Sequence, residues 1–307
     1  MKFNKQRIIS LSYEYIKDLQ KEGFNCIKYG QSQDDPLVIT NNSQNLFIVN
    51  LWFLTHFLIS DLYPRNKQVK VFAVGTDFCV QENNNGIFIN LNNGSHQLPL
   101  GYNNFALPNH HIPKNIEKIY CCNCNVKKEN NLFSYLPIGI LKHNISFLCN
   151  AIKENQNLED KKNLLYINFR YDHHYNNGPM SERKYIYPHF KKFDWATCKE
   201  IVNSKTPEEN HSEFYRDVSL STYTLSPEGM GIDCYRTWEA ISLYSIPIVK
   251  RSNFTERLNE SNLPILIVDQ YKDITKHLLI SNVDKIKNKF NTEPCFNNYW
   301  KNILTNN

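Results

Sequence analysis

Residues 221–249 read STYTLSPEGMGIDCYRTWEAISLYSIPIV, and this stretch decides the fold. It opens with the β-branched and aromatic residues of a buried strand, and a loop that contains two glycines follows at 226–232. Asp233 is placed to cap a helix that runs to about Tyr244, and residues 246–249 form a second short apolar strand. A strand, a helix and a strand in this order make a βαβ unit, which predicts a parallel sheet with helices packed against it.

The same alternation continues on both sides of this stretch. Apolar strands are predicted at 164–169 and 264–268, and a long terminal helix with an apolar stripe is predicted over 274–290. Residues 206–209 (TPEE) combine an N-cap, a proline at the first helical position and a capping-box glutamate, so a helix should begin there. A further helix, capped by an aspartate, is predicted over 194–202.

The N-terminal half shows a second α/β series. Short apolar runs predict strands at 37–40, 69–74, 86–91 and 119–122. The apolar segment 46–59 is shorter than the ~20 residues of a membrane span and is interrupted by polar side chains, so it is predicted to be a buried helix. A polar stretch at 150–163 separates the two series. Together they predict an α/β protein of two Rossmann-like domains, residues 1–155 and 156–307.

Length and composition are those of a globular protein. The 307 residues suffice for two domains, and 41% hydrophobic residues against 21% charged ones exclude a chain that is disordered throughout. The net charge of +5 is spread along the chain without a basic block, so nucleic acid is the least expected partner. No apolar segment is long enough to predict an integral membrane span.

Cysteines and histidines do not predict a metal site. The nine cysteines form an odd set without the repeated spacing of a disulfide framework, which favours a reducing compartment. The run CCNC at 121–124 lacks a second ligand pair at the spacing that a four-ligand zinc site requires. His173 and His174 are adjacent, so their side chains point apart and are interpreted as loop histidines.

The glycine loop and the helix after it are suited to bind an anion. Backbone amides at a helix N-terminus lack partners and carry the positive end of the helix dipole, which favours phosphate. Asp233, Arg236 and Glu239 are spaced by three, so they are expected along one helix face, with the arginine on a diphosphate and Glu239 on ribose hydroxyls. Alternatively, Asp233 only caps the helix and pairs with Arg236. A nicotinamide fingerprint and a Walker loop do not fit, because a third glycine and a Gly-Lys-Ser/Thr sequence are missing.

Residues 226–249 resemble the donor-binding signature of exostosin-like glycosyltransferases of the GT-B fold, and most closely that of the ribitol xylosyltransferase group. In that signature a Ser/Cys-Pro-x-Gly-x-Gly-x-Asp run is followed by Arg, by Trp-Glu-Ala and by a small-x-Pro-Ile-Val strand. The stretch LLYINFRYDHHYNNGPMSERKYIY at 164–187 is similar to the first strand and loop of the same domain. Residues 135–140 (YLPIGI) and the Tyr-Trp pair at 299–300 also resemble the family, whereas the likeness is thin before residue 130.

The resemblance implies two Rossmann-like domains that face each other across a cleft. It implies a hexosyl- or pentosyltransferase that takes a nucleotide-sugar donor, with UDP and xylose as the expected parts, and a glycan acceptor. No cofactor other than the donor is implied. Carried over residue by residue, the donor site comprises Ser226, Glu228, Gly229, Gly231, Asp233, Arg236 and Glu239. Arg170 and Arg183 are further cations aimed at phosphate, the alternative being a solvated basic loop.

The mechanism expected for such a site is an inverting transfer without a metal. No Asp-x-Asp motif occurs, so Arg236 and the helix N-terminus are expected to stabilise the leaving diphosphate. The acceptor hydroxyl also needs a base to take its proton. Asp77 follows the predicted strand 69–74, at the sheet edge where open α/β proteins place ligands, and is the candidate catalytic base. The alternative is an aspartate that only forms an Asx-turn.

Two other functions stay open. One is a non-catalytic glycan or nucleotide-sugar binding module that has kept the transferase fold, and the other, ranked last, is a nucleic-acid-binding protein that uses the positive net charge. Family xylosyltransferases are usually tethered to membranes of the secretory pathway. This chain shows neither a stem nor an anchor, so a soluble cytoplasmic enzyme of bacterial or viral origin is expected.

Overall fold

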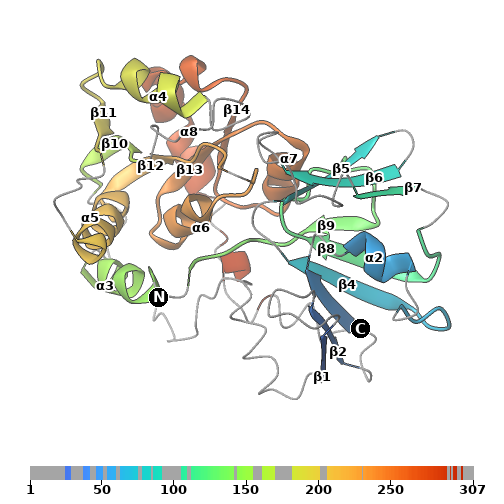
Figure 1. Ribbon diagram of the computed structural model, residues 1–307. Helices are drawn as coiled ribbons and strands as arrows, with labels where there is room; N and C mark the ends of the chain where they lie inside the picture. Colours follow the sequence, from blue (N-terminus) through green and yellow to red (C-terminus); the bar gives the residue numbers. More distant parts are fainter. Residues whose placement is uncertain are drawn as a thin grey trace.

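Two large β-sheets, flanking helices and a small third sheet make up the computed structural model of this chain (Figure 1). The residues that the structure describes are 25–28, 37–41, 46–50, 54–59, 63–74, 78–83, 86–91, 105–108, 112–141, 144–154, 161–169, 182–200, 206–229, 231–288, 291, 293–295 and 299.

A five-stranded parallel sheet forms the C-terminal part of the chain. Its order is β11-β10-β12-β13-β14, and every neighbouring pair is parallel. The strands are β10 (Asn163–Ile167), β11 (Ala196–Cys198), β12 (Ser221–Leu225), β13 (Ile246–Lys250) and β14 (Leu266–Val268). The βαβ unit predicted from residues 221–249 is confirmed, because β12 and β13 flank α6 (Tyr235–Ser242) and pair in parallel.

Helices cover both faces of this sheet (Figure 1). Leu165 and Ile167 of β10 belong to one core, which includes side chains of α4 (Arg183–Phe190) and α8 (Lys276–Lys287). Tyr166, between them, belongs to a second core with side chains of α5 (Pro207–Ser219) and α6. Successive side chains of a strand point to opposite faces, and this produces the two helical layers. The terminal helix predicted over 274–290 is α8.

The capping signal at residues 206–209 is confirmed. The Thr206 hydroxyl accepts from the Glu209 amide at 3.2 Å, and the Glu209 carboxylate accepts from the Thr206 amide at 2.8 Å. The helix predicted over 194–202 is wrong, because Ala196–Cys198 is the edge strand β11. Its backbone pairs in parallel with β10, and a ladder with a distant segment outweighs a single local capping signal.

A six-stranded mixed sheet forms the N-terminal part, with the order β1-β2-β3-β4-β8-β9. The antiparallel strands are β1 (Asn25–Lys28), β2 (Leu37–Asn41) and β3 (Leu46–Asn50). Beyond β3 the pairing is parallel, through β4 (Val69–Val74), β8 (Ile116–Cys121) and β9 (Phe133–Tyr135). The strands predicted at 37–40, 69–74 and 119–122 are thereby confirmed.

The buried helix predicted over 46–59 is wrong in its first half. Residues 46–50 form β3, and helix α2 (Leu54–Ile59) begins only afterwards. The run Leu-Phe-Ile-Val is rich in β-branched and aromatic side chains, and it pairs with β2 on one side and β4 on the other. The strand-helix-strand unit of this half is therefore β3-α2-β4.

Residues 86–91 are a strand, as predicted, but they do not join the parallel sheet. They form β6 (Gly86–Leu91), which lies between β5 (Phe78–Asn83) and β7 (Phe105–Pro108) in a three-stranded antiparallel sheet. Only two residues connect β5 to β6, which suits a hairpin and leaves no room for a crossover helix. The N-terminal part thus departs from a regular α/β alternation.

The two large sheets share one hydrophobic core. Buried side chains of both parts, such as Ile119 and Trp238, belong to the same cluster. Helix α7 (Asn253–Glu260) packs against β9, and its Phe254 ring meets Tyr135 edge-on with centroids 6.5 Å apart. Helix α3 (Ile145–Glu154) precedes the predicted boundary at residue 155, yet it packs against α5 of the C-terminal part.

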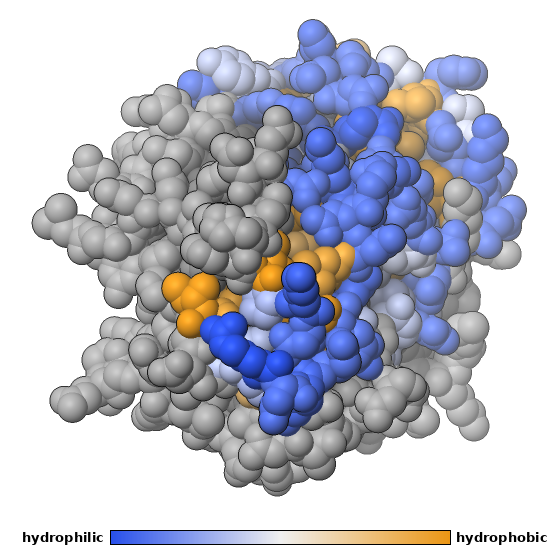
Figure 2. All heavy atoms as spheres, turned by 90° about the vertical axis from the view of Figure 1, so that its right-hand side faces the viewer, coloured by the Kyte–Doolittle hydropathy of each residue, from blue (hydrophilic) through white to orange (hydrophobic). Residues whose placement is uncertain are grey.

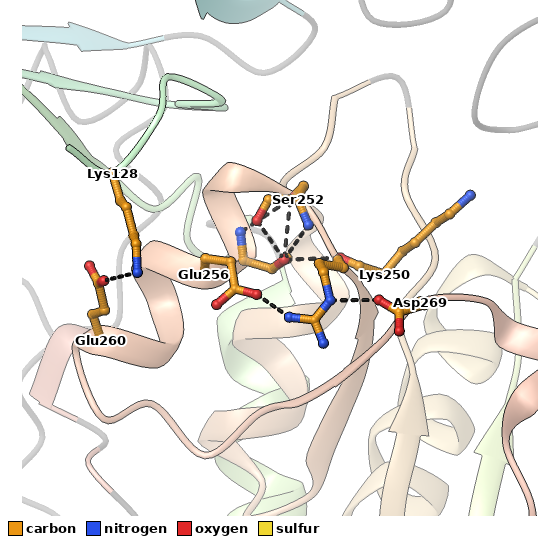
Figure 3. A network of polar contacts seen from close by, with 8 residues as sticks. Lys128, Lys250, Ser252, Glu256, Glu260 and Asp269 are labelled. Atoms are coloured by element: carbon orange, nitrogen blue, oxygen red, sulfur yellow. Dashed lines mark hydrogen bonds and ion pairs between the residues drawn. The ribbon is translucent and has the colours of Figure 1, made fainter. Parts of the chain in front are cut away.

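Arg257 of α7 is a buried cation at this junction. Its guanidinium donates to four backbone carbonyl oxygens of the N-terminal part, those of Val126, Lys127, Asn130 and Phe133. The Val126 and Phe133 bonds measure 3.1 and 2.9 Å. An exposed ion pair at 3.4 Å, between Lys128 and Glu260, spans the same two segments (Figure 3). The guanidinium thereby fixes a long loop of one part onto a helix of the other.

The described surface is mostly polar. Figure 2 shows a largely hydrophilic face with a few hydrophobic side chains near its centre. Large hydrophobic residues that are exposed within the described ranges are Ile59, Tyr185 and Ile280. Within the same ranges, no helix is long and apolar enough to cross a membrane.

Replacing Arg257 with alanine is expected to lower the free energy of unfolding by about 3–5 kcal/mol, because buried acceptors lose a charged donor. Arg251→Ala is the matched control. The half-exposed guanidinium of Arg251 pairs with Glu256 of α7 and with Asp269, which follows β14 (Figure 3). The free energy of unfolding of this variant should therefore fall by no more than about 1 kcal/mol. Urea unfolding followed by circular dichroism measures both. Equal losses in the two variants would show that Arg257 does not anchor the junction.

Candidate functional site

The candidate site lies at the carboxyl ends of the strands of the five-stranded sheet. Phe169 follows β10, the loop 226–231 follows β12, and Lys250 ends β13. Tyr271 begins a short 3-10 helix, η6 (Tyr271–Asp273), after β14. Open α/β sheets bind ligands at this edge, because the loops that leave parallel strands gather there.

The loop 226–231 is tied to the helix that it precedes. The hydroxyls of Ser226 and Thr237 hydrogen-bond at 2.8 Å, and the Cys234 thiol donates to the Pro227 carbonyl at 3.1 Å. The Gly229 amide also donates to the Gly231 carbonyl at 3.0 Å. These contacts leave the loop conformation set by α6, so a ligand meets a preformed backbone.

Arg183 holds this loop from the other side. Its Nε donates to the Glu228 carbonyl and its Nη2 to the Pro227 carbonyl, each at 3.0 Å, while its guanidinium lies 5.5 Å from the centre of the Phe169 ring. The sequence predicts a phosphate-binding cation at this position. In the structure Arg183 is buried and positions the loop backbone through these two bonds.

Gly229 stands beside Arg183 and has ordinary space around it. A Cβ added at Gly229 would meet Arg183 Nη2 at 3.4 Å and the Cys234 sulfur at 3.5 Å, which are tight but tolerable contacts. Among the glycines of the described residues, a positive φ occurs only at Gly139. The glycine at 229 is therefore not required by backbone strain.

Arg236 lies on the first turn of α6, close to two aromatic rings. Its guanidinium is 5.9 Å from the centre of Phe169 and 5.5 Å from that of Phe214 on α5. Its Nε is buried and has no hydrogen-bond partner among the described residues. A buried N–H without an acceptor costs stability, so this atom is suited to donate to an anion that comes from outside the protein.

Asp233 is placed differently from the cap that the sequence predicts. Cys234 is the N-cap of α6, without a side-chain bond, while the buried Asp233 carboxylate accepts from Trp238 Nε1 at 2.8 Å and from the Ile138 amide at 2.9 Å. The Asp233 amide donates to the Asn123 side chain at 2.8 Å. Asp233 thus joins α6 to two segments of the N-terminal part, and the interpretation as a simple cap is wrong. No contact between Asp233 and Arg236 is seen.

Glu239 lies deeper in α6 and is buried. Its carboxylate accepts a hydrogen bond from the Tyr215 hydroxyl of α5 at 2.6 Å. Burial, followed by the negative charge of Glu239, raises the pKa of Tyr215, and the positive charge of Arg236 partly opposes this. The Tyr215–Glu239 pair therefore lies near Arg236, on the α5 side of the helix. Of the three residues spaced by three, Glu239 bonds to α5 and Asp233 bonds to the N-terminal part.

Glu228 carries the carboxylate of the loop. Burial raises the pKa of Glu228, the charge of Lys250 lowers it, and Glu182 raises it. Lys250 in turn pairs with Glu182, with Nζ and Oε1 2.5 Å apart. This end of the site therefore holds the carboxylates of Glu228 and Glu182 beside Lys250 and Arg183, whereas at the other end the Arg236 guanidinium lies over the Phe169 and Phe214 rings.

Several predicted site residues lie outside the described residues. These are Arg170, which follows Phe169, and Asp77, which follows β4 (Val69–Val74) after two further residues. Their roles stay predictions. The described part of the chain contains no group of three or more His, Cys, Asp and Glu side chains that could hold a metal ion. The buried thiols of the CCNC run, at 121, 122 and 124, lie in the N-terminal core.

Sequence reasoning did not point to Phe169, Phe214, Lys250 or Tyr271. Phe169 and Lys250 carry a usable signal, because each stands at the carboxyl end of a predicted strand. Phe214 and Tyr271 carry none. Helix α5 and the turn after β14 reach the site only through the packing of the sheet.

The Asp233 carboxylate gives the protein a pH dependence of known sign. Burial raises the pKa of Asp233 from 3.8 to about 7. The folded state therefore binds this proton more tightly than the unfolded state, so the contribution is present at low pH and is lost as pH rises through about 7. Asp233→Asn cannot ionise. The free energy of unfolding of the wild type, relative to this variant, should fall by about 1–3 kcal/mol between pH 5 and pH 8.

Urea midpoints at these two pH values, with tryptophan fluorescence as the signal, measure this difference. Subtracting the variant removes the constant effect of the amide. A difference that stays flat, or that grows in favour of the wild type as pH rises, would contradict a raised pKa at Asp233.

Comparison with known proteins finds a family model that matches part of the chain. Residues 153–290 match the RXYLT1 C-terminal domain family, that of ribitol xylosyltransferase 1. The match spans the five-stranded sheet, the loop 226–231 and helix α6. A search of curated proteins gave no match to the chain. The similarity to ribitol xylosyltransferase-like glycosyltransferases expected from the sequence is therefore confirmed for residues 153–290, which match the model of the RXYLT1 C-terminal domain.

Proposed function

We propose that this protein is an inverting glycosyltransferase that moves a sugar, with xylose as the first candidate, from a UDP-sugar to a hydroxyl of a glycan. The family gives the class of activity, a xylosyltransferase-type transfer. The observation that carries the proposal is that the buried Nε of Arg236 has no hydrogen-bond partner among the described residues. Arg236 lies at the start of the helix that follows the loop 226–231, which is called the SPEG loop after its residues 226–229. A diphosphate supplies the acceptors that this donor lacks.

A GT-B arrangement belongs to the proposal. Two sheets with parallel strands lie in different parts of the molecule (Figure 1), and buried side chains of both parts belong to one core. The turn after β8 meets the start of α6, where the Asn123 side chain accepts from the Asp233 amide. The carboxyl end of a strand from the first sheet therefore faces the donor loop of the second. Donor and acceptor would meet where these two edges approach each other.

The proposed departure of the diphosphate is assisted by the protein alone. The chain contains no Asp-x-Asp motif of the kind that holds a metal on a nucleotide sugar. Arg236 and the N-terminus of α6 both place positive charge where the leaving group gains negative charge. Fixed donors of this kind need no reorganisation during the reaction, which is the physical basis of their effect on the rate.

Arg236→Ala is expected to abolish most of the thermal stabilisation by UDP and to lower kcat by about 10²–10³-fold, because a fixed donor to the leaving group is lost. The exposed Arg216 of α5 provides the matched control, and Arg216→Ala should behave as the wild type. The assays are thermal shift with a panel of nucleoside diphosphates and sugar transfer from UDP-xylose, each with and without EDTA. An activity that EDTA removes and manganese restores would overturn the metal-independent mechanism.

Asp77→Asn separates an enzyme from a binding module. Asp77 is proposed as the base that takes the proton of the acceptor hydroxyl, so the variant should keep the thermal shift with UDP and lose about 10²-fold or more of the transfer rate. A transfer rate equal to that of the wild type would exclude Asp77 as the base. If the wild type binds UDP but transfers no sugar to any glycan, the non-catalytic binding module is the better function.

A further inference from the structure

Tyr271 is a buried tyrosine whose hydroxyl has no partner in the described part of the chain. It begins η6, just after β14, and its ring belongs to the core between the sheet and the helices α4 and α8. Only 5% of the residue is exposed, and the hydroxyl has no hydrogen-bond partner among the described residues. Burial raises the pKa of Tyr271, so the hydroxyl keeps its proton and is a donor at neutral pH.

Other buried tyrosines of the same sheet are satisfied. The Tyr223 hydroxyl donates to the Leu279 carbonyl at 2.8 Å, and the Tyr215 hydroxyl donates to Glu239 at 2.6 Å. In these two cases the fold supplies an acceptor to the buried hydroxyl. A buried tyrosine whose hydroxyl has no acceptor among the described residues is less stable than the more apolar phenylalanine would be, so this hydroxyl is suited to bind a ligand.

The surroundings of Tyr271 indicate what that group is. The charges that act on its hydroxyl are those of Glu228, Cys234 and Glu182, with Arg183 opposing them. The hydroxyl thus lies near the SPEG loop and the start of α4, at the carboxylate end of the candidate site. Carboxylates repel a diphosphate but accept hydrogen bonds from sugar hydroxyls, while a tyrosine donates to a sugar oxygen. Lys250 pairs with Glu182, which leaves Glu228 as the carboxylate of the loop beside it.

We propose that Tyr271 and Glu228 bind the transferred sugar of the donor, with the Tyr271 hydroxyl donating to a sugar oxygen and Glu228 accepting from a sugar hydroxyl. This inference rests on the proposed function. The proposal divides the site into two ends. Arg236, which lies over Phe169 and Phe214, binds the diphosphate, and Tyr271 with Glu228 binds the sugar. Arg183 lies between the two ends, because it donates to the loop carbonyls of Pro227 and Glu228 and, like Arg236, lies over the Phe169 ring.

Tyr271→Phe tests the assignment, because it removes one oxygen atom and keeps the packing of the ring. Its affinity for UDP-xylose, measured by calorimetry, should fall by about 3–10-fold, the range for one lost hydrogen bond, while its affinity for UDP stays unchanged. Its melting temperature without ligand should equal or exceed that of the wild type, because an unpaired buried hydroxyl has been removed.

Tyr223→Phe is the matched control. It loses a hydroxyl that is bonded on the α8 side of the sheet, so its melting temperature should drop by a few degrees, about 2–4 °C, and both affinities should be those of the wild type. In the expected result, Tyr271→Phe loses affinity for UDP-xylose but no stability, whereas Tyr223→Phe loses stability but no affinity. A purely structural role of Tyr271 would not produce this combination.

Three results would overturn the assignment. Unchanged UDP-xylose affinity in Tyr271→Phe excludes a sugar contact. An equal loss of affinity for UDP and for UDP-xylose moves the contact to the nucleotide part of the donor. A wild-type protein that binds UDP but gains no affinity from xylose leaves the proposed diphosphate site intact and removes the sugar site, whereas a wild type that binds neither removes the proposed function as well.

Discussion

The buried carboxylate of Asp233 is the contact on which the candidate site depends. It stands between the SPEG loop and α6, yet its bonds reach the indole of Trp238 and the backbone at Ile138, and its own amide reaches Asn123. One residue therefore fixes the start of the helix, the segment after β9 and the turn after β8. Because the partners come from both parts of the chain, the position of Arg236 is determined by the N-terminal sheet as well as by α6 itself.

Local signals in the sequence predicted the elements, and contacts between distant segments decided the rest. The βαβ unit at 221–249 and the capping box at Thr206 are written in a few consecutive residues, so they were predictable. The segments 46–50 and 196–198 became strands because partners far along the chain paired with them. Secondary-structure propensity and capping signals describe one segment at a time. They do not include the hydrogen bonds that a strand makes with distant segments once the sheet has formed.

The site shows the same division. Arg236 was predictable, because it stands on the first turn of a helix after a glycine loop. Arg183 was recognised as a cation, but its bonds to the loop depend on α4 lying across the ends of β10 and β12, which no local pattern reveals. An aspartate before a helix usually caps it, and only the fold shows that Asp233 is occupied elsewhere. Tyr271 becomes informative through the absence of an acceptor within the described residues, a property of packing rather than of sequence.

Charge is distributed along the site in a way that suits a ligand with unlike ends. The Arg236 guanidinium lies over two aromatic rings and is partly buried, so its attraction for an anion is stronger than at an open surface. At the other end, burial raises the pKa of Glu228, and the positive charge of Lys250 lowers it. A ligand with an anionic end and a hydroxyl-bearing end would be oriented by this distribution of charge.

The guanidinium of Arg257 has a consequence for how substrates are received. Hinged enzymes use part of the binding free energy to bring two halves together, and their affinities include the entropy of that closure. Here a charged side chain of α7 is saturated by carbonyls from the opposite part, and a single hydrophobic core continues across the junction. The relative orientation of the two sheets is therefore set during folding, and under the proposed function a donor and an acceptor would enter a frame that is already assembled.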